Sequence, residues 1–307
     1  MSKQSIKAVI IKKSTGNAFY KFGPLTNGEG KLNELYLPFS KKFTFDDLKY
    51  FAGMLDGDGH ISLKNGRASV ELELEEKDAF PVAFLADALD LSVQYSVRSG
   101  GKTIQNKDRK KTSSLRTFVQ GEKAYMLLCM IFPFLLEKKG VVRKILATKF
   151  SNLDFFSLEK QFSFAYLAGY ADAEGSFQKL IRTSKRTNHS NMSFRFQLTS
   201  TDEDHIRYLC SCLREKGFNV KVHSYKRNRL RKDGSPNKDM HRIDVTDLRS
   251  LKRLYNLFLP YAKIHRKIDV MKSTIIYVDY FSAKHYDKEK VGRLARRKDE
   301  YKKENSI

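Results

Sequence analysis

The feature that most limits how this chain can fold is a sequence motif that occurs twice. The first copy begins at Tyr50 and reads YFAGMLDGDGHISL, and the second begins at Tyr166 and reads YLAGYADAEGSFQKL. Each copy has an aromatic and an apolar residue before Ala-Gly, and later an Asp, a small residue, an acidic residue and Gly. Similar segments follow each copy at nearly constant spacing, and Pro133 and Pro260 fall at equivalent places. An internal repeat of this extent predicts two halves of similar structure.

The hydrophobic periodicity predicts the same order of elements in both halves: helix, strand, strand, helix, strand, strand, helix. The motif lies in the first of these helices, which is predicted over 45–57 and over 161–173. The closing helices are predicted over 121–149 and 247–277. The expected fold class is therefore α+β, with two pseudo-symmetric halves that each contain antiparallel strands.

The repeat also predicts the division of the chain. Asp78 and Asp202 precede the middle helices and are predicted to cap their N-termini. The expected segments are an N-terminal extension (1–44), a first half (45–150), a linker (151–160), a second half (161–280) and a C-terminal tail rich in Lys and Arg (281–307).

Two small-residue pairs, Ala52–Gly53 and Ala168–Gly169, lie in the middle of the predicted motif helices. A Gly inside a helix costs about 1 kcal/mol relative to Ala, so its presence needs a structural reason. Small residues allow two helix backbones to approach closely. We therefore expect the two motif helices to pack on each other about a pseudo-twofold axis.

The acids of the motif, Asp56 and Asp58 in one copy and Asp172 and Glu174 in the other, fall at helix C-termini. The helix dipole disfavours carboxylates there by about 0.3–1 kcal/mol each, and two close carboxylates repel each other. A divalent cation with oxygen ligands, such as Mg²⁺, would relieve both costs. Asp58 and Glu174 are therefore the candidate metal ligands. Asp56 and Asp172, two residues earlier, are interpreted as structural caps or as groups outside the ligand set.

The charge of the chain indicates an anionic partner. Lys and Arg number 58 and Asp and Glu 35, which gives a net charge of +23. Nucleic acid is the first candidate and an anionic membrane surface the second. Basic loops at 100–112, 184–190 and 227–238 recur at equivalent places in the halves. The longest apolar run, 124–136, falls short of the roughly 20 residues that span a bilayer, so no membrane partner is expected. Three cysteines without a second pair predict a reduced intracellular protein with no zinc site.

The two motif copies resemble the signature motifs of the LAGLIDADG homing endonucleases, in the single-chain form that carries both copies. The resemblance covers about residues 45–280. It implies saddle-shaped sheets that lie along the major groove of double-stranded DNA, and site-specific double-strand cleavage that leaves 3′ overhangs. It also implies an intron-encoded monomer, located in a mitochondrion or chloroplast. Two or three divalent cations are implied as cofactors, normally Mg²⁺, with Mn²⁺ or Ca²⁺ able to substitute in binding.

The resemblance further implies roles for individual residues. The last acids of the motifs, Asp58 and Glu174, would hold the metals together with the backbone carbonyls of Gly57 and Ala173. A basic residue after the Pro of each closing helix would act at the scissile phosphate. Lys138 fits in the first half. In the second half His265 stands at the equivalent position, with Lys263 and Arg266 close to it, so this second role is left open. A polar residue that orders water would end the second strand, at Glu76 and Ser200.

Strand alternation predicts which side chains face the DNA, because successive residues of a strand point to opposite faces. The apolar set predicts the core, and the polar set has the side-chain types that read base edges. The predicted DNA-facing residues of the first half are His60, Ser62, Lys64, Arg67, Ser69, Glu71, Glu73, Gln94, Ser96, Arg98 and Arg116. Those of the second half are Ser176, Gln178, Arg182, Ser193, Arg195, Gln197, Lys221, His223, Tyr225, Arg227, Arg229, Arg242 and Asp244.

Two alternative functions share this charge and this fold. One is an RNA-binding intron maturase, whose partner would be intron RNA, and the other is a transcriptional regulator with an inactive nuclease core. Acids are intact at both motif ends. A protein that only binds nucleic acid has no reason to keep a repelling pair, so the sequence favours the endonuclease.

Overall fold

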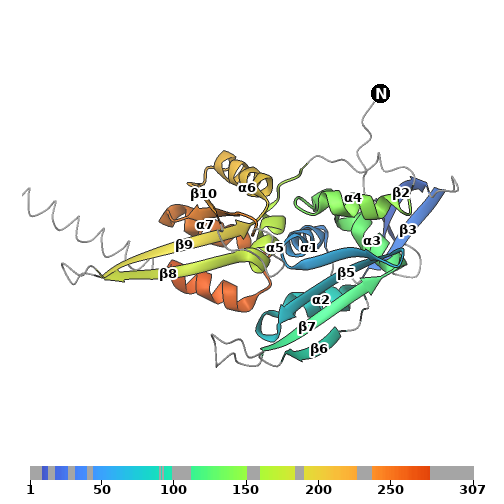
Figure 1. Cartoon of the computed structure of the whole chain (residues 1–307), viewed down its shortest axis with the longest axis horizontal. Helices are drawn as coiled ribbons and strands as arrows, with labels where there is room; N and C mark the ends of the chain where they lie inside the picture. The colour runs from blue at the N-terminus through green and yellow to red at the C-terminus, as the bar shows by residue number, and fades with distance from the viewer. Residues whose placement is uncertain are drawn as a thin grey trace, which may run out of the picture.

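A computed structural model of the chain describes residues 9–12, 18–26, 32–39, 44–89, 91, 93–98, 112–150, 160–183, 190–226 and 237–276. Two halves lie side by side, and one helix from each half lies at the junction between them (Figure 1). A small sheet from the N-terminal segment lies beyond the first half.

The first half begins with the motif helix. Its elements are α1 (Phe45–Gly57), β4 (Gly59–Lys64), β5 (Arg67–Glu75), the 3₁₀ turn η1 (Glu76–Asp78), α2 (Phe80–Leu89), β6 (Val93–Arg98), β7 (Thr112–Gln120), α3 (Glu122–Ile131), η2 (Phe132–Phe134) and α4 (Lys139–Ala147). The four strands form an antiparallel sheet in the order β4-β5-β7-β6.

The second half repeats this arrangement. Its elements are α5 (Phe164–Glu174), β8 (Gly175–Thr183), β9 (Ser190–Ser200), α6 (Glu203–Glu215), β10 (Lys221–Tyr225), β11 (Met240–Val245), α7 (Leu248–Phe258) and a further helix over 265–276. Its antiparallel sheet has the order β10-β11-β9-β8. The expected α+β class and the repeated order of elements are confirmed.

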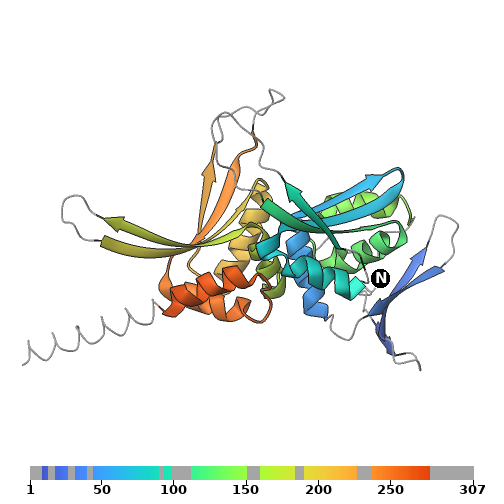
Figure 2. The same cartoon turned by 90° about the horizontal axis from the view of Figure 1, so that it is seen from below.

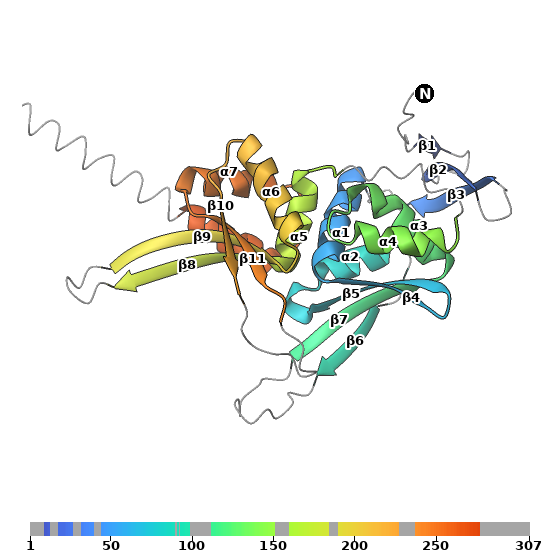
Figure 3. The same ribbon diagram turned by 45° about the horizontal axis from the view of Figure 1, so that its top comes forward.

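The N-terminal segment contains a third sheet that the sequence analysis did not predict. It consists of β1 (Val9–Lys12), β2 (Ala18–Thr26) and β3 (Leu32–Phe39), paired antiparallel in that order. Figure 3 shows this sheet at the outer end of the first half, away from the second half.

Helix ends differ from the predictions at places with a clear local cause. Helix α5 begins at Phe164 because Ser163 caps it, accepting the Tyr166 backbone N–H at 3.0 Å. The closing helices are interrupted: Pro133 lies in the 3₁₀ turn between α3 and α4, and Pro260 follows the end of α7. Proline cannot donate the backbone hydrogen bond that a continuing helix requires.

Of the two predicted caps, only one forms. Asp202 accepts the backbone N–H of His205 at 2.9 Å and caps α6. The carboxylate of Asp78 instead binds the guanidinium of Arg266, at 2.6 and 3.0 Å. An arginine fork offers two charge-assisted hydrogen bonds, which are stronger than a single backbone contact.

The core lies between the sheets and the helices. Residues Val70, Leu72, Phe196 and Leu198 turn inward from the strands and are at most 2% exposed. Figures 2 and 3 show the helices of both halves gathered on one side of the sheets. Among the described elements no helix covers the opposite face of either sheet, so this face is open to a partner. No described helix has both the length and the apolar character needed to cross a membrane.

Candidate functional site

The two motif helices cross at their glycines. A Cβ atom placed on Gly53 would lie 2.0 Å from the carbonyl oxygen of Tyr166. A Cβ atom placed on Gly169 would lie 1.9 Å from the carbonyl oxygen of Tyr50. These distances leave no room for any side chain, so the backbones of α1 and α5 are in direct contact.

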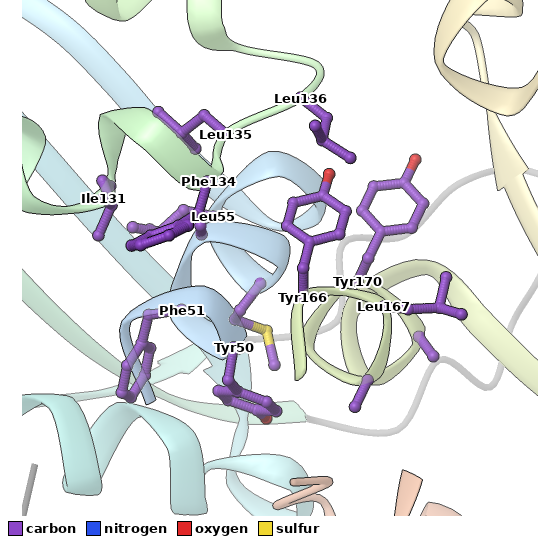
Figure 4. Close-up of a cluster of buried hydrophobic side chains, with 14 of the residues drawn as sticks. Tyr50, Phe51, Leu55, Ile131, Phe134, Leu135, Leu136, Tyr166, Leu167 and Tyr170 are labelled. Carbon is purple, nitrogen blue, oxygen red and sulfur yellow. The ribbon is translucent and has the colours of Figure 1, made fainter. Parts of the chain in front are cut away.

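Other small and aromatic residues complete this contact. Ala52 and Ala168, the neighbours of the two glycines, are completely buried. In Figure 4, Tyr166 and Tyr170 extend from α5 toward Leu136, whereas Tyr50 extends from α1 in the opposite direction. This opposed arrangement is what an approximate twofold axis between the helices produces.

The first acid of each motif copy is a buried structural group. Asp56 accepts the backbone N–H groups of Leu136, Glu137 and Lys138 at 2.7, 3.0 and 2.8 Å. It also accepts the hydroxyl of Tyr166, from the other half, at 2.8 Å. Burial raises the pKa of Asp56 above its ordinary value, while the three backbone donors lower it. These bonds attach the start of α4 to the end of α1.

Asp172 has the same role in the second half. It accepts the backbone N–H groups of Lys263 and Ile264 at 2.7 and 3.1 Å, and the hydroxyl of Tyr50 at 2.7 Å. Burial raises the pKa of Asp172, and the backbone N–H of Lys263 lowers it. Each acid therefore connects its own half, through a tyrosine, to the other half.

The last acid of each copy stands at the end of its helix and is partly exposed. Asp58 is the C-cap of α1, with its backbone N–H donating to Met54 at 2.9 Å, and Glu174 is the last residue of α5. Partial burial raises the pKa of both carboxyl groups. The charge of Asp58 raises the pKa of Glu174 further, whereas Lys138 and Lys267 lower it.

Two pockets flank these helix ends, and each one is built from both halves. A pocket of about 210 Å³ is lined by Glu174 of the second half and by Gly57 and Lys138 of the first half. A pocket of about 430 Å³ is lined by Asp58 of the first half and by Ala173 and Lys267 of the second half. Each pocket therefore combines the terminal acid of one half with a carbonyl-bearing residue and a lysine of the other.

The lysine of each pocket is held by backbone carbonyls at a helix end. The ammonium of Lys138 donates to the carbonyls of Leu55, Gly57 and Gly59 at 2.6, 3.2 and 2.7 Å. An ammonium group has three donors, and here all three are used. Burial lowers the pKa of Lys138, and the nearby Asp56 and Glu137 raise it.

Lys267 is the counterpart of Lys138 in the second half. Its ammonium donates to the carbonyls of Ala171, Ala173 and Gly175 at 3.1, 3.2 and 3.0 Å, and also to that of Asp172. Burial lowers the pKa of Lys267, and Asp172 raises it. The two lysines therefore occupy equivalent positions, one at the end of each motif helix.

This placement adds Lys267 as a candidate for the second basic residue, a role that the sequence left open between His265, Lys263 and Arg266. Lys263 forms an ion pair with Asp47 at 2.8 Å, and His265 stacks on Phe80 at 5.3 Å, so both lie away from the pockets. Spacing from the proline pointed to His265. However, the backbone bonds of Asp172 set where the 265–276 helix starts, and the side chain two residues further on reaches the end of α5. The sequence does contain a signal for Lys267, which is the third basic residue in the run that begins at His265.

Of the two residues predicted to order water, Ser200 and Glu76, the structure describes only the side chain of Ser200. Ser200 lines the smaller pocket and donates to Glu137 at 3.2 Å, where Tyr170 also donates at 3.1 Å. Burial raises the pKa of Glu137, and the charge of Asp56 raises it further. The side chain of Glu76 lies outside the described residues. Sequence reasoning did not identify Glu137, which has no acidic counterpart at the equivalent backbone position, Ile264.

Those predicted DNA-facing residues whose side chains the structure describes lie on the uncovered sheet faces, and most of them are exposed or half-exposed. That group consists of His60, Ser62, Lys64, Arg67, Glu71, Glu73, Gln94, Arg116, Ser176, Gln178, Ser193, Arg195, Lys221, His223, Tyr225 and Arg242. The side chains of Ser96, Arg98 and Arg182, and the whole of Arg227 and Arg229, lie outside the described residues.

Three residues of the predicted set are buried: Ser69, Gln197 and Asp244, at 2%, 6% and 5% exposure. Alternation assigned them to the correct face, because their strand neighbours Val70, Leu198 and Ile243 are buried on the core side. In this structure these three side chains are nevertheless not exposed for direct contact with a base edge.

Comparison with solved structures finds similar folds. A lysine-to-alanine mutant of I-SmaMI matches with a TM-score of 0.51 and 14% identity, covering 81% of this chain and 96% of that one. A second structure shows the I-SmaMI LAGLIDADG homing endonuclease bound to cleaved DNA. It matches with a TM-score of 0.49 and 14% identity, covering 81% of this chain and 94% of that one. The chain has the fold of the single-chain LAGLIDADG homing endonucleases. A LAGLIDADG meganuclease, I-AabMI, bound to uncleaved DNA, matches at 0.49 and 17% identity, covering 76% and 91%.

The likeness is structural only. No protein-family profile matches the sequence, and a search of curated proteins finds no relative. The LAGLIDADG fold nevertheless accounts for the doubled motif, because each copy forms one of the two central helices.

The oxygen donors at the helix ends of this LAGLIDADG fold fit a hard divalent cation. Each pocket places the acid at the end of one motif helix, Asp58 or Glu174, beside a residue of the other half, Ala173 or Gly57, whose backbone carbonyl is a further oxygen donor. The described residues contain no group of three His, Cys, Asp or Glu side chains that could hold a metal. One carboxylate beside one backbone carbonyl suits Mg²⁺, which commonly binds through one or two carboxylates, several waters and the phosphates of a substrate. Lys138 and Lys267 already bind the carbonyls of Gly57 and Ala173, so Asp58 and Glu174 would be the principal ligands of such an ion.

Proposed function

We propose that this protein is a site-specific DNA endonuclease that cuts both strands at two composite centres. One observation carries the proposal: each pocket joins the terminal acid of one half to the lysine of the other, on either side of the crossed helices. Two equivalent centres related by a twofold axis match the two strands of a duplex, which are related in the same way. The fold of I-SmaMI, a homing endonuclease, supports the same assignment.

The residues of each centre have distinct tasks. Asp58 and Glu174 would hold a divalent ion, which would supply an activated water and offset negative charge at the phosphate. Lys138 and Lys267 hold a positive charge next to the place that the scissile phosphate would occupy. Since all three donors of Lys138 bind carbonyls, it acts through its charge, or exchanges one carbonyl for a phosphate oxygen.

DNA binding is assigned to the two uncovered sheet faces and to the net charge of +23. Phosphate contacts position a protein on a duplex, and side chains that reach base edges give sequence specificity. The strands of both sheets carry Arg, Lys, His and Gln side chains on the side away from the helices. One chain contains both halves, so a monomer supplies both centres.

The test is cleavage of a plasmid that carries the uninterrupted allele of the host gene, in the presence of Mg²⁺. Asp58→Asn and Glu174→Gln should each abolish double-strand cleavage but preserve DNA binding in Ca²⁺. Lys267→Ala should lower the cleavage rate strongly, and the matched control His265→Ala should cut normally. Cleavage by both acid variants at the wild-type rate would overturn the metal-site assignment.

The same experiment tests the finer points. The ends of the products should carry 3′ overhangs, and Mn²⁺ should replace Mg²⁺. Intron RNA added in place of DNA tests the maturase alternative: tight, specific RNA binding without DNA cleavage would favour that function. An origin inside an organellar intron rests only on the resemblance to the LAGLIDADG homing endonucleases, and the genomic neighbours of the gene test it.

A further inference from the structure

A buried carboxylate lies on the outer face of the second-half sheet. Asp244, on β11, is 5% exposed although its strand neighbours Ile243 and Val245 face the core. The strand register places it between Lys221 of β10 and Gln197 of β9. Asp244 therefore lies within the face that the proposed function assigns to DNA, yet its own carboxylate is covered.

The groups that cover Asp244 are hydrogen-bond donors. Gln197 donates its amide to Oδ1 at 2.9 Å, and Arg242 donates to Oδ2 at 3.0 Å with its Nε 2.9 Å from Oδ1. His223 Nε2 lies 3.4 Å and an Arg195 nitrogen 3.9 Å from Oδ2. One carboxylate thus accepts hydrogen bonds from Gln197 and Arg242, and nitrogens of Arg195 and His223 lie within 4 Å of it.

A carboxylate taken out of water is costly unless it is paired and hydrogen-bonded. Around Asp244 the positive charge exceeds the negative charge, because two arginines lie near one carboxylate. Arg242 is also fixed by the ring of Tyr225, at 4.7 Å. The side chains of Arg195 and Arg242 remain 22% and 21% exposed. Their unused N–H groups therefore face the open side of the sheet in a limited set of orientations.

A guanidinium has five donors, and the contacts with Asp244 use only part of them. The buried Nε atoms of Arg195 and Arg242 both lack a hydrogen-bond partner within the described part of the chain, so the hydrogen bonds to Asp244 come from Gln197 and a terminal nitrogen of Arg242. Guanine presents two acceptors, O6 and N7, in the major groove, and an arginine fork binds both. An arginine that is already oriented loses less conformational freedom when it binds.

We propose that Asp244 is a positioning residue that orients Arg195 and Arg242 to read guanine in the half of the target that contacts the second sheet. This inference rests on the proposed function. Asp244 itself contacts no base, and Gln197 acts by completing the shell around it rather than by reading adenine. The specificity of this half-site thus depends on a residue that the DNA does not reach.

The first-half sheet supplies a matched control. There Arg116 binds Glu71 at 2.7 Å, with 37% and 17% of the two side chains exposed. This is a single pair, in which the carboxylate remains more accessible than that of Asp244. Glu71→Gln removes one charge from an equivalent sheet face without changing the cluster around Asp244.

The experiment is selection of bound duplexes from a random DNA pool in Ca²⁺, followed by sequencing. The wild-type protein should enrich guanine at one or two positions on the second-half side. Asp244→Asn should reduce that preference about tenfold, since a bidentate pair is worth about 1–3 kcal/mol of discrimination. Arg242→Lys, which keeps the charge and the pairing with Asp244, should lose preference at the same positions. Glu71→Gln should change only positions on the opposite side.

The outcomes distinguish a failure of the role assigned to Asp244 from a failure of the proposed function. If Asp244→Asn keeps the wild-type base profile, or loses affinity equally at every position together with a lower melting temperature, Asp244 is not a positioning residue. If Arg242→Lys changes different positions from Asp244→Asn, the cluster does not act as one unit. If the wild-type protein enriches no sequence at all, the proposed function fails, and this inference with it.

Discussion

Replacing Gly53 with Ala adds a single methyl group at the crossing of α1 and α5. The new Cβ would lie 2.0 Å from the carbonyl oxygen of Tyr166 and 2.8 Å from the amide nitrogen of Tyr170, whereas ordinary contact begins at 3.4 Å. Both contacting atoms belong to the backbone of a helix and cannot turn aside. The helices must therefore separate by more than 1 Å.

The expected loss of stability follows from what this separation breaks. A gap of about 0.5–1 Å already removes a quarter to a half of the dispersion energy between packed atoms. Two hydrogen bonds between the halves, from Tyr50 to Asp172 and from Tyr166 to Asp56, would stretch beyond their present 2.7 and 2.8 Å. A hydrogen bond to a charged group contributes about 1.5–3 kcal/mol. We expect Gly53→Ala to lower the free energy of unfolding by about 3–6 kcal/mol, against typical totals of about 5–15 kcal/mol.

The measurement is urea unfolding followed by circular dichroism, with Gly140→Ala as the control. Gly140 lies in α4, and nothing stands within 4 Å of a Cβ placed there. Ala is favoured over Gly in helices by about 0.5–1 kcal/mol, so the control should be unchanged or slightly more stable. If Gly53→Ala unfolds at the same urea concentration as the wild type, the close helix crossing is not a determinant of stability.

Three further outcomes are expected. Asp58→Asn and Glu174→Gln, in the absence of metal, should each raise the free energy of unfolding at pH 7 by about 0.3–1 kcal/mol, because each removes a negative charge from a helix C-terminus; thermal melting would show a fall instead if these acids were structural. Burial raises the pKa of Glu137 above its ordinary value, so its contribution to stability is fully present below the unfolded-state pKa of about 4.3 and is lost as pH rises through the folded-state pKa. Glu137→Gln should therefore flatten this decline in unfolding experiments from pH 4 to 8, and an unchanged slope would contradict the assignment. DNA affinity should fall steeply with salt, by roughly 0.9 in the slope of log K against log salt for each phosphate neutralised, and a slope near zero in filter binding would exclude a phosphate-lined interface.

The sequence by itself determined the features that depend on local pattern. The doubled motif predicted two similar halves, and the glycines at 53 and 169 predicted the close helix crossing, since no other residue fits between two touching backbones. Alternation assigned polar and apolar strand residues to opposite faces, because that property depends only on the pleat of one strand. The acids at the helix ends followed from the same motif.

Tertiary structure alone decided which of these residues are accessible and which basic residue reaches each pocket. Lys267, rather than His265, lies at the end of α5 because backbone bonds to Asp172 set where the 265–276 helix starts, and no spacing in the sequence records a contact of that kind. Gln197 and Asp244 lie on the predicted face but are buried there: Gln197 of β9 donates to Asp244 of β11, and His223 of β10 also lies against that carboxylate. Burial on a sheet face depends on neighbours that are distant in the chain, so the pattern of a single strand can assign the face but not the exposure.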